Sequence, residues 1–205
     1  MSRAKTVCWA GGQMLTYPDV HKVQIGGMWV KVLATADDSL ELREFGPADV
    51  AEYHALVQRN AAHLTRLGDY RDEVASSTTD VAYRFAERTE VPVRFGVYLQ
   101  QRLVGRVDLV PVEPPRYGLG YWLSEDVTGR GHATAAVAAL LRYAGEELGA
   151  TDVFAGVTRG NVRSEAVLQR LGFRVVANFD SYRRFHHSLS PRQPGTSPGG
   201  ANVSR

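Results

Sequence analysis

Hydrophobic and polar residues alternate along several short stretches of the chain, the pattern of a β-strand with one buried face. The first clear example begins at residue 40, where Leu40 and Leu42 are separated by Glu41 and followed by Arg43. Three similar stretches follow one another in the middle of the chain, and three more lie near its end. The alternation predicts seven strands, at residues 40–45, 93–99, 103–110, 117–123, 153–157, 173–177 and 179–185.

Other stretches repeat apolar residues every three or four positions, which is the spacing of an amphipathic helix. The clearest helix is predicted between His132 and Leu148, where Val137, Leu140 and Ala144 share one face. Gly149 then follows, and glycine is common just beyond the end of a helix. Three further helices are predicted: from Pro47 to about Asn60, through Ala82, Phe85 and Ala86 toward Thr89, and from Val162 to Leu171.

The order of these elements indicates the fold class. Residues 117–157 read as strand, helix and strand, an arrangement that normally makes the two strands parallel neighbours. The other strands follow one another through short links, and short links join antiparallel strands. We therefore expect a mixed sheet covered by helices, an α/β domain of the α+β type.

The two ends of the chain lie outside this regular pattern. Residues 1–36 contain strand-like pieces at 22–25 and 29–33, which are consistent either with a hairpin at the sheet edge or with an extension outside the core. Residues 188–205 are rich in proline, glycine and serine and contain little to bury, so we expect a disordered tail. The predicted domain occupies residues 37–187.

Composition narrows the classes of function. The net charge is only +2 and the basic residues are scattered, which argues against a nucleic-acid partner. The chain contains no run of about 18 apolar residues, so no membrane span is predicted. The first residues lack the apolar stretch of a secretory signal. Cys8 is the only cysteine, which excludes an internal disulfide and a cysteine-rich metal site. A cytoplasmic protein without a metal is the simplest expectation.

A turn with two glycines precedes the longest predicted helix. Residues 123–134 read Leu-Ser-Glu-Asp-Val-Thr-Gly-Arg-Gly-His-Ala-Thr, with Gly129 and Gly131 in the turn. Glycines let a ligand approach the backbone, and the start of a helix offers unpaired N–H groups and the positive end of its dipole. These features suit a diphosphate. The Rossmann and Walker glycine patterns do not fit here, and an ordinary tight turn remains open.

A second motif follows the strand at 153–157. Asn161 stands three residues before Ser164, and Leu171-Gly172-Phe173 ends the next helix. Asn161 is a good helix cap, but the order of motifs also resembles the Gcn5-related N-acetyltransferase (GNAT) superfamily, in particular its RimJ/RimL-like branch. Residues 128–133 resemble the cofactor loop of that superfamily, and Gly120-Tyr121-Trp122-Leu123 resembles the end of its preceding strand. The resemblance extends over about residues 39–187.

This resemblance implies a GNAT-like fold, acetyl-CoA as the acyl donor, and a set of site residues. The fold has a mixed, mostly antiparallel sheet of about six to seven strands with one central parallel pair and helices on both faces. The pantetheine arm would lie between the strands at 117–123 and 153–157, which splay apart. Ser164 would be catalytic, as the donor to the leaving thiolate. The cofactor-binding residues implied by the resemblance are Trp122, Leu123, Ser124, Gly129, Arg130, Gly131, His132, Ala133, Thr134, Asn161 and Ser164.

The sequence departs from the superfamily pattern at three positions. Thr128 stands where the cofactor loop usually has Gln or Arg, and Leu168 stands where many relatives have a tyrosine that acts as general acid. Gly118 occupies a position where RimJ/RimL-like chains often have a glutamate. The general base is therefore open, with three candidates and water as the default: Asp108, Glu113 and His132. For Asp108 and Glu113, a solvated surface position is the first expectation.

The acceptor would enter across the cleft, where the resemblance implicates the first two helices and the last strands. We expect Asn60, His63 and Tyr182 to contact it, with Tyr70 and Arg184 as further candidates. The predicted activity is transfer of an acetyl group to a primary amine, either a protein N-terminal α-amine or an amine of a small molecule such as an antibiotic. A catalytically idle CoA-binding module is the alternative. Both a monomer and a homodimer are compatible with the sequence.

Overall fold

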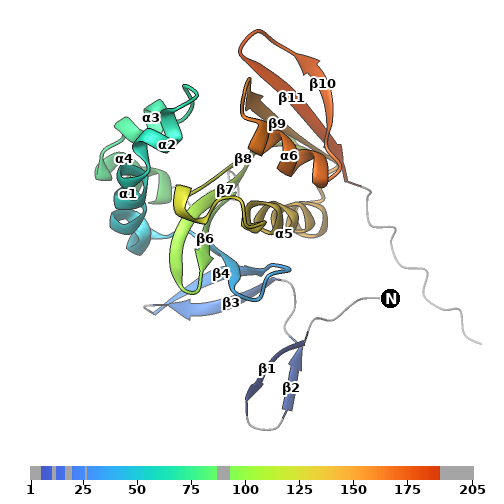
Figure 1. Ribbon diagram of the computed structural model, residues 1–205. Coiled ribbons are helices and arrows are strands. Elements are labelled where there is room, and N and C mark those ends of the chain that lie inside the picture. Colours follow the sequence, from blue (N-terminus) through green and yellow to red (C-terminus); the bar gives the residue numbers. More distant parts are fainter. Residues whose placement is uncertain (1–5, 11–12, 17–19, 26, 87–92, 190–205) are drawn as a thin grey trace, which may run out of the picture.

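The computed structural model describes residues 6–10, 13–16, 20–25, 27–86 and 93–189, and Figure 1 labels their main elements. The predicted tail covers residues 188–205; Ser188 instead ends the last strand, opposite Asp152, and residues 190–205 lie outside the described residues. In chain order the elements are β1 (Thr6–Ala10), β2 (Gln13–Thr16), β3 (Val20–Ile25), β4 (Met28–Ala34), β5 (Leu40–Glu44), the 3₁₀ turn η1 (Pro47–Asp49), α1 (Val50–Arg59), α2 (Ala61–Thr65), α3 (Arg71–Ala75), α4 (Thr78–Ala86), β6 (Val93–Leu99), β7 (Arg102–Glu113), β8 (Arg116–Leu123), the 3₁₀ turn η2 (Glu125–Val127), α5 (His132–Glu147), β9 (Asp152–Thr158), α6 (Val162–Arg170), β10 (Arg174–Asn178) and β11 (Tyr182–Ser188).

Nine strands form one sheet in the order β10-β11-β9-β8-β7-β6-β5-β4-β3. All neighbours are antiparallel except β8 and β9, which are parallel. The predicted mixed sheet with one central parallel pair is confirmed, but the expected number of six to seven strands was too small. The difference is the antiparallel pair β3 and β4, which continues the sheet beyond β5. Strands β1 and β2 form a separate two-stranded antiparallel sheet.

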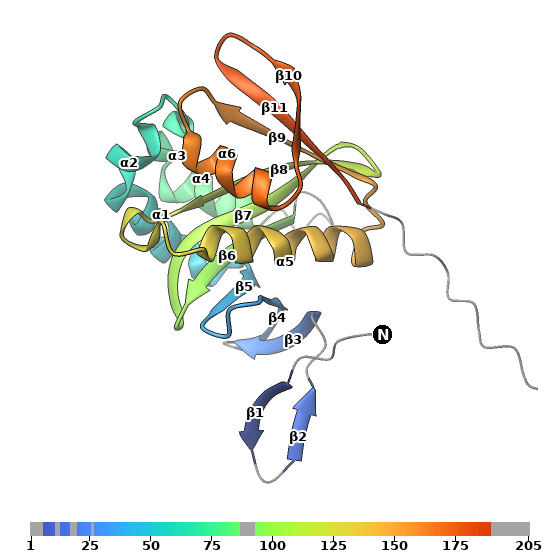
Figure 2. The ribbon, with the colours of Figure 1, turned by 45° about the vertical axis from the view of Figure 1, so that its right-hand side comes forward.

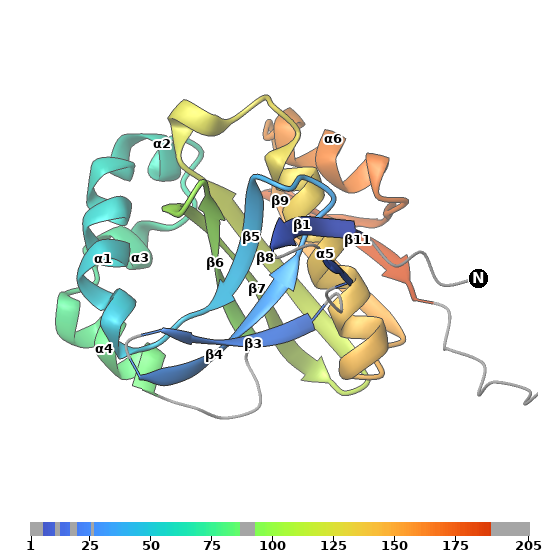
Figure 3. The ribbon, with the colours of Figure 1, turned by 90° about the horizontal axis from the view of Figure 1, so that it is seen from below.

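Helices cover both faces of the sheet, as predicted, with α1 to α4 on one side and α5 on the other (Figures 2 and 3). On the α5 side, Val137, Leu140 and Ala144 are completely buried against side chains of the central strands. On the other side, α1 and α4 contribute Tyr53 and Phe85 to a separate cluster. Two cores therefore stabilise the sheet from opposite faces.

The short helices α2 and α3 were not predicted from the sequence. Each has five residues, which is fewer than two turns, so no apolar repeat marks them. They lie between α1 and α4 and bring the intervening loop toward β8 and β9. Within the described segments, no helix combines the length and the apolar character needed to cross a membrane.

Candidate active site

Strands β8 and β9 separate after a short parallel contact. Their pairing covers only three positions, from Arg116 opposite Asp152 to Gly118 opposite Phe154. The Ser124 N–H donates a hydrogen bond to the Val104 carbonyl of β7, with a nitrogen–oxygen distance of 2.7 Å. Backbone groups point alternately to the two sides of a strand, so those of Leu123 and Tyr121 face the opening toward β9. The splayed strands therefore present backbone donors and acceptors to a ligand.

The glycine turn and the start of α5 close one end of this opening. Gly129 and Gly131 have φ values of +78° and +88°, and a Cβ at either position would meet nothing within 4 Å. Gly131 caps α5, whose first turn holds neither a side-chain cap nor an acidic residue. The first helical hydrogen bond runs from the Ala135 N–H to the Gly131 carbonyl at 3.0 Å, which leaves the amides of residues 132–134 without a helical acceptor. This arrangement fits a diphosphate.

His132 contributes to this corner differently from Arg130. Its Nδ1 lies 3.0 Å from an Asp37 carboxylate oxygen, in the link between β4 and β5. A hydrogen bond from Ser39, together with the His132 contact, lowers the pKa of Asp37. The His132 ring is therefore engaged with Asp37 and offers the corner its backbone amide, whereas the Arg130 side chain is exposed.

The start of α6 forms the opposite wall. Asn161 caps the helix by accepting from the Ser164 N–H at 3.2 Å, and the Tyr121 hydroxyl donates to the Ser164 carbonyl at 3.1 Å. Burial raises the pKa of Tyr121 to about 12, so its hydroxyl stays protonated at neutral pH. Arg163 also reaches the Thr128 hydroxyl, at 3.4 Å. The structure thus brings the glycine turn and the Asn161–Ser164 motif together across the opening.

A buried charged cluster lies on the sheet face covered by α1 to α4. Arg106 contacts Glu73 at 3.2 Å and Asp108 at 3.5 Å, and the Tyr53 hydroxyl donates to Glu73. Burial opposes the charge of Arg106, but the carboxylates of Asp108 and Glu73 hold the pKa of Arg106 above its ordinary value. Asp108, expected on the surface, is only 6% exposed, because β7 is a central strand and Arg106 neutralises the carboxylate. Glu113 is at the surface, as expected.

The link between α2 and α3 spans the separated strands. The Tyr70 hydroxyl donates to the Tyr121 carbonyl of β8 at 2.8 Å, and the Thr158 hydroxyl of β9 donates to the Asp69 carboxylate. Tyr70 has a φ of +55°, which is unusual for a residue other than glycine. Burial raises the pKa of Tyr70 well above its usual value. Two adjacent residues of one loop therefore bind the two arms of the opening.

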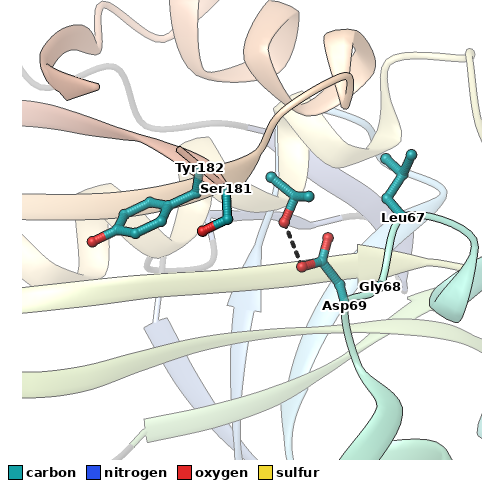
Figure 4. Close-up of a pocket in the computed structure, with 7 residues that line it drawn as sticks. Leu67, Gly68, Asp69, Ser181 and Tyr182 are labelled. Atoms are coloured by element: carbon teal, nitrogen blue, oxygen red, sulfur yellow. Dashed lines mark hydrogen bonds between the residues drawn. The ribbon is translucent and has the colours of Figure 1, made fainter. Parts of the chain in front are cut away.

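A hollow of about 390 Å³ lies beside this loop (Figure 4). It is lined by Leu67, Gly68, Asp69, Gly156, Thr158, Ser181 and Tyr182. Its walls thus come from the α2–α3 link, from β9 and from the start of β11. The hollow is the candidate place for an acceptor, because it adjoins the opening on the face away from α5.

The residues expected to contact the acceptor fall into different surroundings. Tyr182 lines the hollow and stacks on Phe179, with ring centroids 4.5 Å apart. Asn60 is 7% exposed, and its carboxamide oxygen accepts from the Ser124 hydroxyl and the Glu125 N–H, each at 3.0 Å. Asn60 therefore holds the loop after β8 in place, which suits a positioning role.

His63 and Arg184 lie outside the hollow. His63 is 3.7 Å from Glu125, and burial lowers its pKa although Glu125 opposes the shift. Arg184 lies over the Phe154 ring at 5.7 Å. Sequence reasoning missed Asp69, which no motif marks, and the pairing of Arg106 with Glu73, whose partners are far apart in the chain.

Comparison with known proteins agrees with this geometry. A family model described as an acetyltransferase (GNAT) domain matches residues 39–174. YdaF of Bacillus subtilis (strain 168), provisionally named a ribosomal N-acetyltransferase, is 25% identical over 146 residues, which cover 67% of this chain and 79% of YdaF.

Solved structures share the fold. RimL, a ribosomal L7/L12 alpha-N-protein acetyltransferase in complex with coenzyme A, has a TM-score of 0.68 at 18% identity, covering 75% of this chain and 96% of RimL. MccE, a microcin C7 self-immunity acetyltransferase in complex with acetyl-CoA and AMP, has a TM-score of 0.64 at 16% identity, covering 75% and 94%. The match over residues 39–174, joined to the splayed strands and the glycine turn, shows that this chain belongs to the GNAT acetyltransferase family.

Proposed function

We propose that this protein is an acetyl-CoA-dependent N-acetyltransferase that acetylates a primary amine by direct attack within a ternary complex. The observation that carries the proposal is the three-residue contact between β8 and β9, which opens beside a helix start with free amides. RimL and MccE, which have the same fold, were solved with coenzyme A and acetyl-CoA respectively.

Each part of the site has a role in this proposal. The amides of residues 132–134 would hold the diphosphate, with Arg130 adding a charge contact. The backbone of Leu123 would hydrogen-bond the pantetheine arm, whereas the backbones of Trp122 and Ser124 face β7 and would border the arm without pairing with it, as would Asn161. Gly129 and Gly131 leave the room that a side chain would fill.

The chemistry requires a neutral amine next to the thioester. The amine nitrogen forms a bond to the acetyl carbon, the carbon–sulfur bond breaks, and the sulfur leaves with the bonding electrons. An N–H at the end of β8 would hold the charge that develops on the carbonyl oxygen. Ser164 would donate a hydrogen bond or proton to the leaving sulfur, because Leu168 is buried in the core and has no proton to give. The proton lost by the amine passes to water.

Two acceptor classes follow from the relatives. RimL and YdaF point to the α-amine of a ribosomal protein, and MccE points to a small molecule. A panel of free-amine peptides and small amines, incubated with acetyl-CoA, would distinguish them by release of free thiol. We expect release with at least one class. Acetyl-CoA binding without release for any acceptor would refute the proposal and favour an idle CoA-binding module.

A further inference from the structure

The hollow beside the α2–α3 link has a single charged residue in its wall. Asp69 is the only one of the seven lining residues with a formal charge, and Figure 4 shows it with the hydrogen bond to Thr158 drawn. The other lining residues are apolar, hydroxyl-bearing or glycine. A ligand in this hollow therefore meets one negative charge in largely neutral surroundings.

The charge of Asp69 has no cationic partner among the residues that the structure describes. Its hydrogen-bond partner is the neutral hydroxyl of Thr158. The neighbouring carboxylates differ, because Glu73 and Asp108 both contact the guanidinium of Arg106. Of these three carboxylates, Asp69 is therefore the one that can bind a cationic group of a ligand.

The backbone fixes this carboxylate next to the opening. Tyr70, the following residue, has a left-handed conformation and hydrogen-bonds to the β8 carbonyl of Tyr121. Asp69 itself is bound to β9 through Thr158. Non-glycine residues with such backbone angles persist when their surroundings hold them, and they concentrate at functional sites. The carboxylate consequently sits between the two strands whose separation makes the site.

We propose that Asp69 is the residue that selects the acceptor, by binding its amino group as an ammonium ion. This inference rests on the proposed acetyltransferase function. A primary amine is mostly protonated at neutral pH, and a carboxylate forms strong hydrogen bonds with an ammonium group. The acceptor class is a compact primary amine, such as the first residue of a peptide, whose remaining atoms occupy the hollow beside Tyr182. Its ammonium proton is lost to water before the nitrogen attacks.

Two substitutions separate recognition of charge from a merely structural bond. Asp69→Asn removes the charge but retains an oxygen that accepts from Thr158. Thr158→Val removes the bond to the loop but leaves the carboxylate. If Asp69 binds the ammonium group, Asp69→Asn raises KM for the amine at least tenfold, with KM for acetyl-CoA and kcat changing less than threefold. Asp69→Ser, a second neutral variant, gives the same result.

A binding measurement provides a readout that does not depend on turnover. Calorimetry compares a hexapeptide with a free amino terminus and the same peptide acetylated at that terminus, each titrated into the CoA-loaded protein. The wild type binds the free peptide more tightly, and Asp69→Asn reduces this preference at least tenfold. Thr158→Val keeps the preference although its melting temperature falls. Glu147→Gln, at an exposed carboxylate that ends α5 on the side away from the glycine turn, is the matched control and keeps wild-type values.

Failure of the Asp69 proposal can be distinguished from failure of the proposed acetyltransferase function. If wild-type protein releases thiol with an amine but Asp69→Asn shows unchanged KM and unchanged peptide preference, Asp69 does not select the acceptor. The same conclusion follows if Thr158→Val, which keeps the carboxylate, loses the preference as fully as Asp69→Asn, because retaining the charge then does not retain recognition. If the wild type releases no thiol with any amine, the acetyltransferase proposal itself fails.

Discussion

Replacing Gly131 with valine tests the proposed diphosphate site at the start of α5. Gly131 has a φ of +88° and caps α5 where the amides of residues 132–134 converge. A Cβ there would meet no protein atom within 4 Å, and because residue 131 directly precedes the amides of residues 132–134, we expect a valine side chain to project into the space in front of them. The left-handed conformation costs a non-glycine residue about 1–2 kcal/mol. For a domain of this size, the melting temperature should fall by roughly 2–8 °C.

The effect on binding should be larger than this strain alone predicts. A hydrogen bond to a charged group contributes about 1.5–3 kcal/mol. Loss of one amide–phosphate contact would therefore raise the Kd for coenzyme A about 10- to 150-fold. Isothermal titration calorimetry with coenzyme A measures this change directly, without dependence on the acceptor.

Gly149 provides a matched control at the other end of the same helix. It has a φ of +62°, and a Cβ there would also meet nothing within 4 Å. Gly149→Val should lose a similar amount of stability and bind coenzyme A within threefold of wild type. If Gly131→Val binds as tightly as Gly149→Val, the backbone around Gly131 does not hold the diphosphate and the reasoning is wrong.

Three further changes test other parts of the site. Ser164→Ala should lower kcat about a hundredfold and change KM less, as measured by steady-state thiol release; a wild-type kcat would remove Ser164 from the mechanism. Tyr70→Phe should lower the free energy of unfolding by about 1–3 kcal/mol in urea titrations, because the Tyr121 carbonyl loses its donor. The exposed Tyr83→Phe is its control, and an equal loss in both variants would contradict the role of this bond. Burial lowers the pKa of His63, so the unfolded chain binds more protons and stability should fall as the pH drops through about 6.5. His63→Asn should show a smaller drop in melting temperature between pH 7.5 and 5.5, and an equal drop would show that other groups cause it.

Local patterns in the sequence were sufficient to predict the elements around the proposed coenzyme site. The helix at α5 has four turns with a clear apolar face, and Gly131 and Gly149 mark its two ends. The strand–helix–strand order predicted the parallel pair of β8 and β9. The family resemblance added the opening between them, and the three-residue register agrees with it.

The acceptor side depends on contacts between distant residues, and local patterns do not contain them. Asp69 meets Thr158 across 89 positions, and Tyr70 meets Tyr121 across 51. Asp108 looked like a surface residue because its burial depends on Arg106 and on the helices above β7. Asn60 is at the end of α1, where the sequence predicts contact with the acceptor. Its carboxamide oxygen instead accepts hydrogen bonds from Ser124 and Glu125 in the loop after β8.

The short contact between β8 and β9 also has a consequence for hydrogen exchange. Beyond Gly118, the outward amides of β8 have no neighbouring strand, so local openings should expose them to solvent deuterium sooner than the amides that pair with β7. An acyl-donor arm lying in that space would act as a substitute strand. Exchange at Tyr121 and Leu123 should then slow when coenzyme A is added, while exchange on the β7-facing amides changes little.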